Sequence, residues 1–483
     1  MKSASIKKNF IMNALLSMSS FLFPVITFPY VSRILLPEGM GRVTFATSFV
    51  TYFGMIARLG VPTYGVRACA RVRDNRQELS RTAQELLIIN LGMSVLAYFG
   101  LVACVFTVPR IRNDRNLFLV ISATIFLDSI GMEWLYRALE QYTYITIRSL
   151  LFKLIALIAT FLLIHSRDDV VIYGAITILA SSASNVLNFI NAHKYISLKP
   201  IGNYHFQRHL KAVTVFFAMA CATTIYTNLD AVMLGFMKTD ADVGFYNAAV
   251  KVKTVLLSLV TALGTVLLPR LSYYIEQGKG EEFRRITKKA LYFVLLIASP
   301  FSFYFMLYAK EAVLLLSGPA FLEAVAPMRI IMPTVILIGI TNVLGIQILV
   351  PLGREKTVFY SELAGAVVDL ILNALLIPSF GASGAAVGTL VAEMIVLTVQ
   401  AGALKNSIQD MLSQIHWLRL LFALMIGCAS CFWVKLLNLR VLPALLLSAF
   451  CFFGCYGDYL FWRREALVCT LIDEVRGHLK RKR

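Results

Sequence analysis

Apolar residues in this chain fall in blocks of about twenty, separated by short polar segments. A helix of about twenty apolar residues crosses roughly 30 Å of hydrocarbon. Barrel strands would instead alternate apolar and polar residues, and the blocks do not. The pattern therefore predicts an all-α integral membrane protein with about 14 transmembrane helices. The expected spans are 10–32, 41–61, 83–106, 117–136, 147–164, 170–190, 213–236, 244–268, 290–308, 324–350, 358–378, 384–403, 417–437 and 441–462.

The composition agrees with a membrane protein, since 58% of the 483 residues are hydrophobic and 15% are charged. The net charge of +19 raises the question of a nucleic-acid partner. If the N-terminus is cytoplasmic, however, 30 of the 46 Lys and Arg residues lie in cytoplasmic segments and 8 in outer ones. This asymmetry is the positive-inside rule, so both termini are expected in the cytoplasm. The basic charge then serves topology and attraction to membrane lipids, and no nucleic-acid partner is expected.

A weak internal repeat indicates how the helices are grouped. Lys8, Gly41 and Arg67 recur as Lys211, Gly244 and Arg270, at a constant offset of 203 residues. Parallel repeats of this kind are found in transporters whose two halves surround a central site. We therefore expect two pseudo-symmetric six-helix lobes around a central cleft. The expected parts are an N-lobe at 1–190, a cytoplasmic linker at 191–212, a C-lobe at 213–403, helices 13 and 14 at 404–462, and a basic cytoplasmic tail at 463–483.

Motifs for enzymatic chemistry are missing from the sequence. No hydrophilic segment exceeds about twenty residues, the length of a loop rather than of a catalytic domain, and there is no G-x-x-x-x-G-K-[ST] loop for ATP. His205 and His209 are spaced by four residues but lack the glutamate of an H-E-x-x-H motif. We therefore expect no catalytic residue, no metal and no cofactor; coupling to a proton or cation gradient, or to the membrane potential, remains open.

Charged residues inside the expected spans are the candidate site. A charge at mid-membrane costs about 2.5–3.5 kcal/mol on insertion scales, so such residues usually face a cavity or a partner. Basic residues from several helices are expected to form a cationic cleft, and acidic residues are candidates for gating or ion coupling, although structural salt bridges are the alternative for both. The cationic group is Arg58, Lys153, Lys251 and Lys253; the acidic group is Asp230, Asp369 and Glu393.

The segment GMEWLYRALEQYTYITIRS, residues 131–149, is unusually polar for this chain. If it were one continuous helix, its charged residues would form a single stripe. The expected topology instead places a tight turn near 140–145, between helices 4 and 5. One interpretation is a structural clasp between these helices; the other is a cytoplasmic mouth that receives substrate. The residues assigned to the mouth are Arg67, Glu133, Arg137, Glu140 and Arg148.

Several stretches resemble a known family. They include KNFIMNALLSMSSFLFPVITFPYVSRILLPEGMGRVTFA at the N-terminus, YGVRACARVRDN, the 131–149 segment, TNLDAVMLGFMKTDADVGFYNAAVKVK, LVPLGREK and LLIPSFGASGAAVGTLVAE. In order and spacing they resemble bacterial O-antigen and repeat-unit flippases of the multidrug/oligosaccharidyl-lipid/polysaccharide exporter superfamily. The resemblance covers about residues 5–403.

The resemblance implies a multi-pass protein of the bacterial inner membrane that is not an enzyme. It implies alternating access, in which undecaprenyl-pyrophosphate-linked oligosaccharide moves from the cytoplasmic to the periplasmic leaflet for surface polysaccharide biosynthesis. The cationic cleft would contact the pyrophosphate or an anionic sugar. Polysaccharide polymerase and chain-length machinery are candidate protein partners.

Three other functions stay open at this point. A drug/cation antiporter and a peptidoglycan-precursor flippase belong to the same superfamily. Residues 10–32 carry no acidic residue, whereas many antiporters of that superfamily have a coupling aspartate in helix 1. A membrane glycosyltransferase or polymerase is an alternative of another class, and it would be expected to carry a sizeable catalytic loop.

Overall fold

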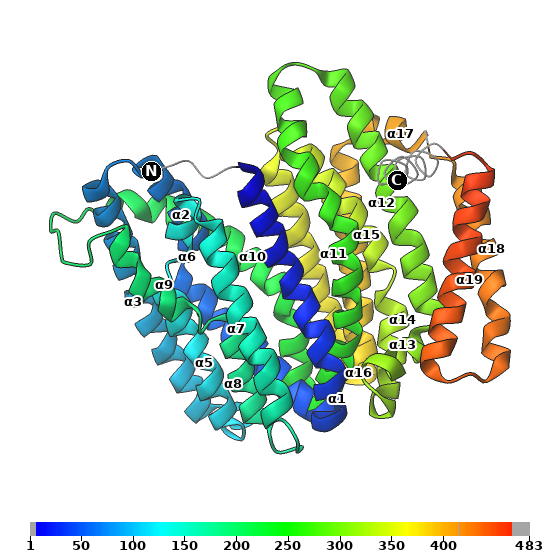
Figure 1. Ribbon diagram of the computed structural model, residues 1–483, viewed down its shortest axis with the longest axis horizontal. Helices are drawn as coiled ribbons and strands as arrows, with labels where there is room; N and C mark the ends of the chain where they lie inside the picture. The colour runs from blue at the N-terminus through cyan, green and yellow to red at the C-terminus, as the bar shows by residue number, and fades with distance from the viewer. Residues whose placement is uncertain (1–5, 414, 466–483) are drawn as a thin grey trace, which may run out of the picture. The chain divides into compact units, whose positions relative to one another are not determined.

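The computed structural model describes residues 6–413 and 415–465, which form helices joined by turns and loops and contain no strand. The expected all-α class is confirmed. The chain divides into two compact units, residues 1–247 and 248–483 (Figure 1). The expected lobes with a linker at 191–212 stay a prediction. In the structure, the helix that follows this linker packs on the first helix within unit 1.

Unit 1 holds the N-terminal helices and the first turns of α11. Its elements are α1 (Ile6–Arg58), α2 (Val61–Arg71), α3 (Arg76–Thr107), α4 (Pro109–Arg112), α5 (Arg115–Ile130), α6 (Glu133–Ala138), α7 (Tyr142–Leu163), α8 (Val170–Ser181), α9 (Asn185–Asn191), η1 (Ala192–Lys194) and α10 (Gln207–Met237).

Unit 2 holds most of α11 and the helices after it. Its C-terminal helices α18 and α19 lie side by side as a hairpin (Figure 1). Its elements are α11 (Asp240–Glu276), α12 (Gly280–Leu307), α13 (Ala309–Leu316), η2 (Pro319–Ala324), α14 (Val325–Ile331), α15 (Thr334–Asn342), η3 (Val343–Leu349), α16 (Glu355–Ala403), α17 (Lys405–Ser413), α18 (Trp417–Phe432), η4 (Trp433–Leu437) and α19 (Val441–Trp462).

The described residues contain 11 helices long and apolar enough to cross a membrane, or up to 12 if the bent pair Pro319–Ile331 and Thr334–Leu349 is one span. Two of the long helices each contain a pair of expected spans. Leu36 breaks α1, with φ 58° and ψ 178°, and Gly381 breaks α16, with φ 51° and ψ −129°. A residue in either conformation cannot continue a right-handed helix. The chain is thus a multi-pass membrane protein, while the number fourteen and the side of the termini stay predictions.

The outer surface of the helices is strongly apolar, as contact with lipid tails requires. Phe99 of α3 exposes 77% of its surface, Leu436 74% and Phe450 79%. In water such side chains would form a large sticky surface, whereas hydrocarbon solvates them without cost. Backbone polar groups are satisfied inside each helix, which is the condition for crossing a membrane.

Two glycines at equivalent places in the weak repeat meet in unit 1. A Cβ added to Gly41 would lie 1.7 Å from the carbonyl oxygen of Asp240 and 3.0 Å from the amide nitrogen of Gly244. A Cβ on Gly244 would lie 2.1 Å from the carbonyl oxygen of Pro37. Only glycine lets the break in α1 and the start of α11 approach this closely.

Candidate functional site

The polar segment 131–149 is divided at two points in the structure. Met132 has φ 41° between α5 and α6, and Glu140 has φ 58° between α6 and α7. Such backbone in residues other than glycine interrupts a helix and costs of order 1–3 kcal/mol each. The expected turn near 140–145 is found at Leu139–Gln141. The continuous stripe is therefore excluded, and the expected span 117–136 is interrupted near its end.

Glu133 nevertheless joins two of the arginines of this segment. Its Oε1 accepts hydrogen bonds from Nη2 and Nε of Arg137, at 2.7 and 3.0 Å, one turn further along α6. Its Oε2 accepts a hydrogen bond from Nη2 of Arg148 in α7, at 3.2 Å. We name these three residues the Glu133 clasp. The clasp ties the short helix α6 to the start of α7 across the turn at Glu140.

The two arginines of the clasp differ in their surroundings. The Arg137 side chain is 50% exposed, while that of Arg148 is 3% exposed. Nη1 of Arg148 donates to the backbone oxygen of Ser184 and to Oδ1 of Asn185, both at 3.3 Å, and its buried Nε finds no acceptor among the described residues. A buried guanidinium needs acceptors for its donors. Arg148 therefore connects α7 to α6 and to the start of α9 in unit 1.

The polar chain continues from Arg148 to Arg58. Nδ2 of Asn185 donates to Oδ1 of Asp128 in α5, at 3.0 Å. The other carboxylate oxygen of Asp128 lies 3.5 Å from Nη1 of Arg58, the last residue of α1. Gly131 makes room for this arrangement, because a Cβ there would lie 2.4 Å from Cγ of Asn185. One network thus links α6, α7, α9, α5 and α1 within unit 1.

Arg58 borders a cavity of about 440 Å³, which we name the Arg58 cavity. Its volume is in the range of small-molecule sites. Thr63, Thr223 and Thr224 line it together with apolar residues of α10. The Arg58 side chain is 37% exposed, and its Nη1 lies 3.5 Å from the carboxylate of Asp128. A guanidinium has five N–H donors, so some of them can still donate to a ligand. A guanidinium with nearby hydroxyls suits an anionic, hydrogen-bonding group.

The other expected mouth residues lie outside this network. Glu140 pairs with Arg73 across the α2–α3 turn, at 3.0 Å, and both side chains are more than 40% exposed. Arg67 lies exposed on α2. The structure therefore brings together Glu133, Arg137 and Arg148 and adds Arg58, while Glu140 and Arg67 stand apart.

The remaining members of the expected cationic cleft are distributed over both units. Lys153 of α7 donates to Oγ of Ser19 and of Ser20 in α1, each at 2.8 Å. Lys251 is exposed and Lys253 half-buried, both on the part of α11 that belongs to unit 2. Contact of all four cations with one ligand stays a prediction.

The three acidic candidates are all buried. Asp230 of α10 is 6% exposed and accepts a short hydrogen bond from the hydroxyl of Tyr246. Asp369 and Glu393, 1% and 4% exposed, lie on the two parts of α16 in unit 2. Gly388 packs beside Asp369, since a Cβ there would lie 2.9 Å from its Oδ1. Burial of charge is typical of functional residues in membranes, and their gating role stays a prediction.

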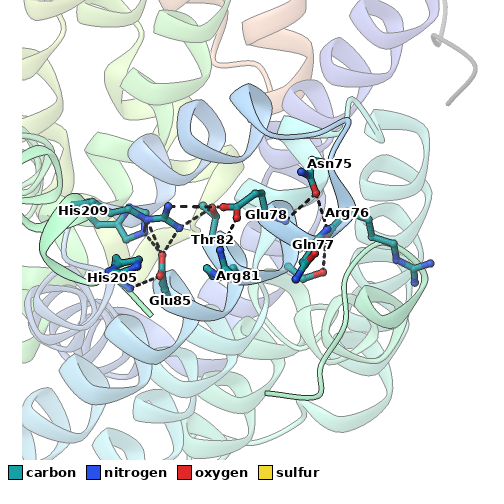
Figure 2. Close-up of polar contacts among 11 residues, drawn as sticks. Asn75, Arg76, Gln77, Glu78, Arg81, Thr82, Glu85, His205 and His209 are labelled. Atoms are coloured by element: carbon teal, nitrogen blue, oxygen red, sulfur yellow. Dashed lines mark hydrogen bonds and ion pairs between the residues drawn. The ribbon is translucent and has the colours of Figure 1, made fainter. Parts of the chain in front are cut away.

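A second buried cluster in unit 1 was missed at the level of sequence (Figure 2). Glu85 of α3 is completely buried and accepts hydrogen bonds from the backbone of His205 and from the side chains of Arg208 and His209. The sequence shows the pair His205 and His209, but the carboxylate that His209 contacts comes from a helix 124 residues away. In the sequence this cluster is indicated only by Glu85 itself, a lone glutamate in the apolar stretch that follows residue 82. No group of three or more His, Cys, Asp or Glu side chains in the described chain is arranged to hold a metal ion.

Comparison with known proteins places the chain in a family. The family described as "Polysaccharide biosynthesis protein" matches residues 6–275, more than half of the sequence. The chain belongs to this polysaccharide biosynthesis protein family. A second family, described as "MatE", matches residues 216–375. The resemblance seen in the sequence is thereby confirmed.

Relatives of this family member cover most of its length. A protein of Escherichia coli (strain K12) named "Putative O-antigen transporter" is 25% identical over 405 residues, which are 83% of this chain and 97% of the relative. Haloferax volcanii has a relative named "Probable low-salt glycan biosynthesis flippase Agl15", 23% identical over 275 residues, 55% of this chain and 56% of that one.

Solved structures share the fold. "Lipid II flippase MurJ, inward closed conformation" superimposes with a TM-score of 0.71 at 16% identity, covering 92% of this chain and 99% of the other. "Inward-facing conformation of a multidrug resistance MATE family transporter of the MOP superfamily" gives 0.65 at 13% identity, covering 84% and 99%. At these identities the likeness concerns the fold alone.

Proposed function

We propose that this protein flips a polyprenyl-pyrophosphate-linked oligosaccharide from the cytoplasmic to the periplasmic leaflet of the inner membrane by alternating access. The observation that carries the proposal is the match of residues 6–275 to the polysaccharide biosynthesis family, together with a relative named as an O-antigen transporter along 97% of its length. The oligosaccharide would serve the assembly of a surface polysaccharide. Polymerase and chain-length proteins are the expected partners.

The physical task fits a polar cavity in an apolar protein. Each sugar hydroxyl buried without a partner costs a few kcal/mol, so a lipid-linked oligosaccharide does not cross a bilayer unaided. A cavity with threonine hydroxyls and an arginine replaces lost water contacts, while the prenyl chain stays in lipid. Transport of this kind forms and breaks no covalent bond, so the proposal does not make the protein an enzyme.

Arg58 is the residue that we propose for contact with the pyrophosphate, supported by the cationic Lys153, Lys251 and Lys253. Guanidinium groups bind phosphate oxygens bidentately, which gives both orientation and attraction. In this view the carboxylate of Asp128 pairs with Arg58 until the pyrophosphate takes its place. Their separation of 3.5 Å is long for an ion pair, so the exchange costs little. An inside-negative potential favours outward movement of the anion, by about 2.3 kcal/mol per uncompensated charge per 100 mV.

The test is export in a deletion strain of the natural host, complemented with wild type or variants at matched membrane abundance. We expect cells without the protein to accumulate repeat units on the inner leaflet and to lack the surface polymer. Arg58→Ala should reproduce that accumulation. Arg73→Ala is the matched control, since it removes another exposed, ion-paired arginine that does not border the cavity.

Two results would overturn the proposal. One is a deletion strain with normal surface polysaccharide and no accumulated repeat unit. The other is purified protein in liposomes that exports cationic drugs against a proton or sodium gradient and leaves labelled polyprenyl-pyrophosphate oligosaccharide on its original leaflet. The second result would favour the antiporter alternative, for which the "MatE" match over residues 216–375 is the relevant observation.

A further inference from the structure

We propose that Tyr64, Glu85, Arg208 and His209, which we name the Glu85 clamp, form a proton-responsive anchor that positions α10 as a wall of the Arg58 cavity. The four side chains come from α2, α3 and the first turn of α10. Glu85 contacts Arg208 and His209, and His209 in turn contacts Tyr64; Figure 2 shows Glu85 beside His209. None of them belongs to the network that links the Glu133 clasp to Arg58.

The carboxylate of Glu85 is saturated with donors. Its Oε1 accepts from the backbone N–H of His205 at 2.6 Å. Its Oε2 accepts from Nε and Nη2 of Arg208, at 3.0 and 2.7 Å, and from Nε2 of His209 at 2.6 Å. Since Glu85 is fully buried, water does not replace any of these partners. The first turn of α10 is therefore attached to α3 through one carboxylate.

The helix that carries Glu85 also fixes the chain that leads into α10. The side chain of Gln84 donates to the backbone oxygens of Ser197 and Lys199, at 2.7 and 2.8 Å, and accepts from the hydroxyl of Tyr204 at 2.7 Å. Oγ of Ser80 accepts from the backbone N–H of Ser197 at 2.9 Å. One side of α3 thus holds both the connecting segment and the start of α10.

His209 can bind a proton without losing either of its partners. A contact of 2.6 Å between Nε2 and a carboxylate oxygen requires a proton between them, so the neutral ring carries its hydrogen on Nε2. Nδ1 then accepts from the hydroxyl of Tyr64, at 2.8 Å. After protonation Nδ1 donates to the same hydroxyl oxygen. Both states keep the hydrogen bonds to Glu85 and Tyr64, and they differ by one positive charge, which lies beside Nε of Arg208, 3.3 Å from Nε2.

The charged groups around His209 determine how a proton on its ring changes the stability of the clamp. Arg208 on α10 offsets Glu85, and Glu78 on α3 lies 2.5 Å from Arg81 and 3.9 Å from Arg208. Tyr64, Cys69 and Arg71 face the cluster from α2. With neutral His209 the two acidic groups, Glu78 and Glu85, balance the two basic groups, Arg81 and Arg208. A proton on His209 brings a second positive charge into this buried site, where Nε of Arg208 lies 3.3 Å from Nε2 and Glu85 supplies a single negative charge. The clamp is therefore weaker in acid.

The position of the clamp is transmitted to the cavity along one face of α10. His209, Phe216 and Thr223 follow at intervals of seven residues, so they share that face. Phe216 and Thr223 line the Arg58 cavity together with Thr224, and His209 reaches Glu85 two turns earlier. Gly60, with φ 72°, touches α10 between these points, because a Cβ there would lie 2.7 Å from the oxygen of Val213. Loosening the clamp should therefore move the wall that faces Arg58.

The link between the cavity and the sugar substrate rests on the proposed function, but the clamp can be tested without substrate. The experiment uses the full chain with its eight cysteines replaced by alanine, carrying Thr223→Cys, in sealed membranes of defined orientation. A membrane-impermeant maleimide, added on the side of the inner loops, labels the thiol introduced by that substitution. The labelling rate is compared with that of the same protein carrying His209→Gln, at each of several values between about pH 5 and pH 8. The ratio of the two rates cancels the intrinsic pH dependence of the thiol.

We expect the labelling rate of the unaltered clamp, divided by that of His209→Gln, to be several-fold higher near pH 5 than near pH 8, because the protonated histidine is repelled by Arg208 and holds α10 less firmly. Glu85→Gln, which keeps the shape and removes the charge, should abolish the pH dependence. Tyr64→Phe should weaken it and is the milder change if Glu85→Gln reduces the amount of folded protein. Arg73→Gln is the matched control and should leave the response intact, since its pair with Glu140 lies on the exposed turn.

A labelling ratio that stays constant with pH, or one that is largest near pH 8, would overturn the clamp. The same is true if Glu85→Gln retains the full pH response of the unaltered protein. Failure of the proposed function looks different, because labelling would follow pH as expected while the complemented strain exports no oligosaccharide. The two ideas therefore fail by separate measurements.

Discussion

Unit 1 contains two polar assemblies that each use one glutamate to hold basic residues from different helices. In the Glu133 clasp the carboxylate is 33% exposed and bridges one exposed and one buried arginine. In the Glu85 clamp the carboxylate is completely buried and meets a guanidinium, an imidazole and a backbone amide. Access of water decides how much stability is lost when one partner of such a pair is removed, because solvent can replace an exposed partner but not a buried one.

The largest effect on stability is expected from Glu85→Ala. The change removes the acceptor of Arg208, His209 and the amide of His205, all within a site that water does not reach. Breaking a buried ion pair by removing one partner costs about 3–5 kcal/mol. Thermal unfolding of detergent-solubilised protein should show a Tm many degrees below wild type. A Tm indistinguishable from wild type would mean that solvent enters the clamp.

The second largest loss of stability is expected from Arg148→Ala. It removes the guanidinium donor from the oxygens of Ser184 and Asn185, which keep hydrogen bonds from Leu187 and Asn188. Glu133 keeps Arg137 and solvent. We expect a loss of about 2–4 kcal/mol, somewhat less than at Glu85, because one of its partners is partly hydrated. Under the proposed function, export should fall more than the amount of folded protein, since Arg148 supports Asn185 and through it Asp128 and Arg58. Export and abundance falling in parallel would favour a purely structural clasp.

A much smaller effect is expected from Arg137→Ala, although Arg137 binds the same carboxylate as Arg148. Its side chain is 50% exposed and pairs with Glu133 at i,i+4 on α6. Such pairs contribute roughly 0.3–0.5 kcal/mol. The Tm of the variant should stay close to that of wild type. Added salt should change the difference in stability between the two proteins by no more than this amount of about 0.3–0.5 kcal/mol. A destabilisation comparable to that of Arg148→Ala would show that exposure is the wrong criterion for this clasp.

The smallest effect is expected at Asp169, before α8, where a carboxylate is held by backbone amides. Its Oδ2 accepts from the N–H groups of His165 and Ser166, at 2.8 and 2.7 Å. These hydrogen bonds hold the pKa of Asp169 below its ordinary value. A lowered pKa means that this stabilisation is present above the unfolded value, about 3.9, and is lost as the pH falls through the folded one.

Hydrogen exchange of the segment 164–169 is the measurement for this residue. We expect protection of its amides to fall only below about pH 4 in wild type, and Asp169→Asn to reduce protection at neutral pH without changing the Tm. The expected order of effects would be reversed if Asp169→Asn altered global stability more than Arg137→Ala.

Much of the clasp was accessible from the sequence, whereas the clamp was not. Glu133 and Arg137 stand four residues apart, so a helix of any orientation places them side by side. Arg148 could be added because it lies just beyond a turn that the hydrophobic blocks required, and that turn was found at Leu139–Gln141. Asp128 is a charged residue inside the expected span 117–136, but its connection to Arg148 passes through Asn185, 57 residues further along.

Glu85 and His209 show why the remainder was hidden. They are separated by 124 residues, and the distance between their atoms depends on how α3 and α10 pack. His205 and His209 lack the glutamate of an H-E-x-x-H motif, so their spacing gave no sign of Glu85. In the structure His205 contributes its backbone amide to Glu85 and His209 contributes its ring. Local periodicity does not contain this information, because it reports the face of one helix and not the partner of that face.

The sequence by itself determined that this chain spans the membrane many times, since hydrophobic blocks of about twenty residues have no other stable environment. It also determined where the helices are interrupted by polar segments and which charged residues lie in apolar surroundings. Only the tertiary structure decided which charges meet, that the helix after the linker packs in unit 1, and that Arg58 borders a cavity. The physical reason is that the hydrophobic effect acts on every residue through its own surface, whereas an ion pair exists only when two helices place its atoms within about 4 Å of each other.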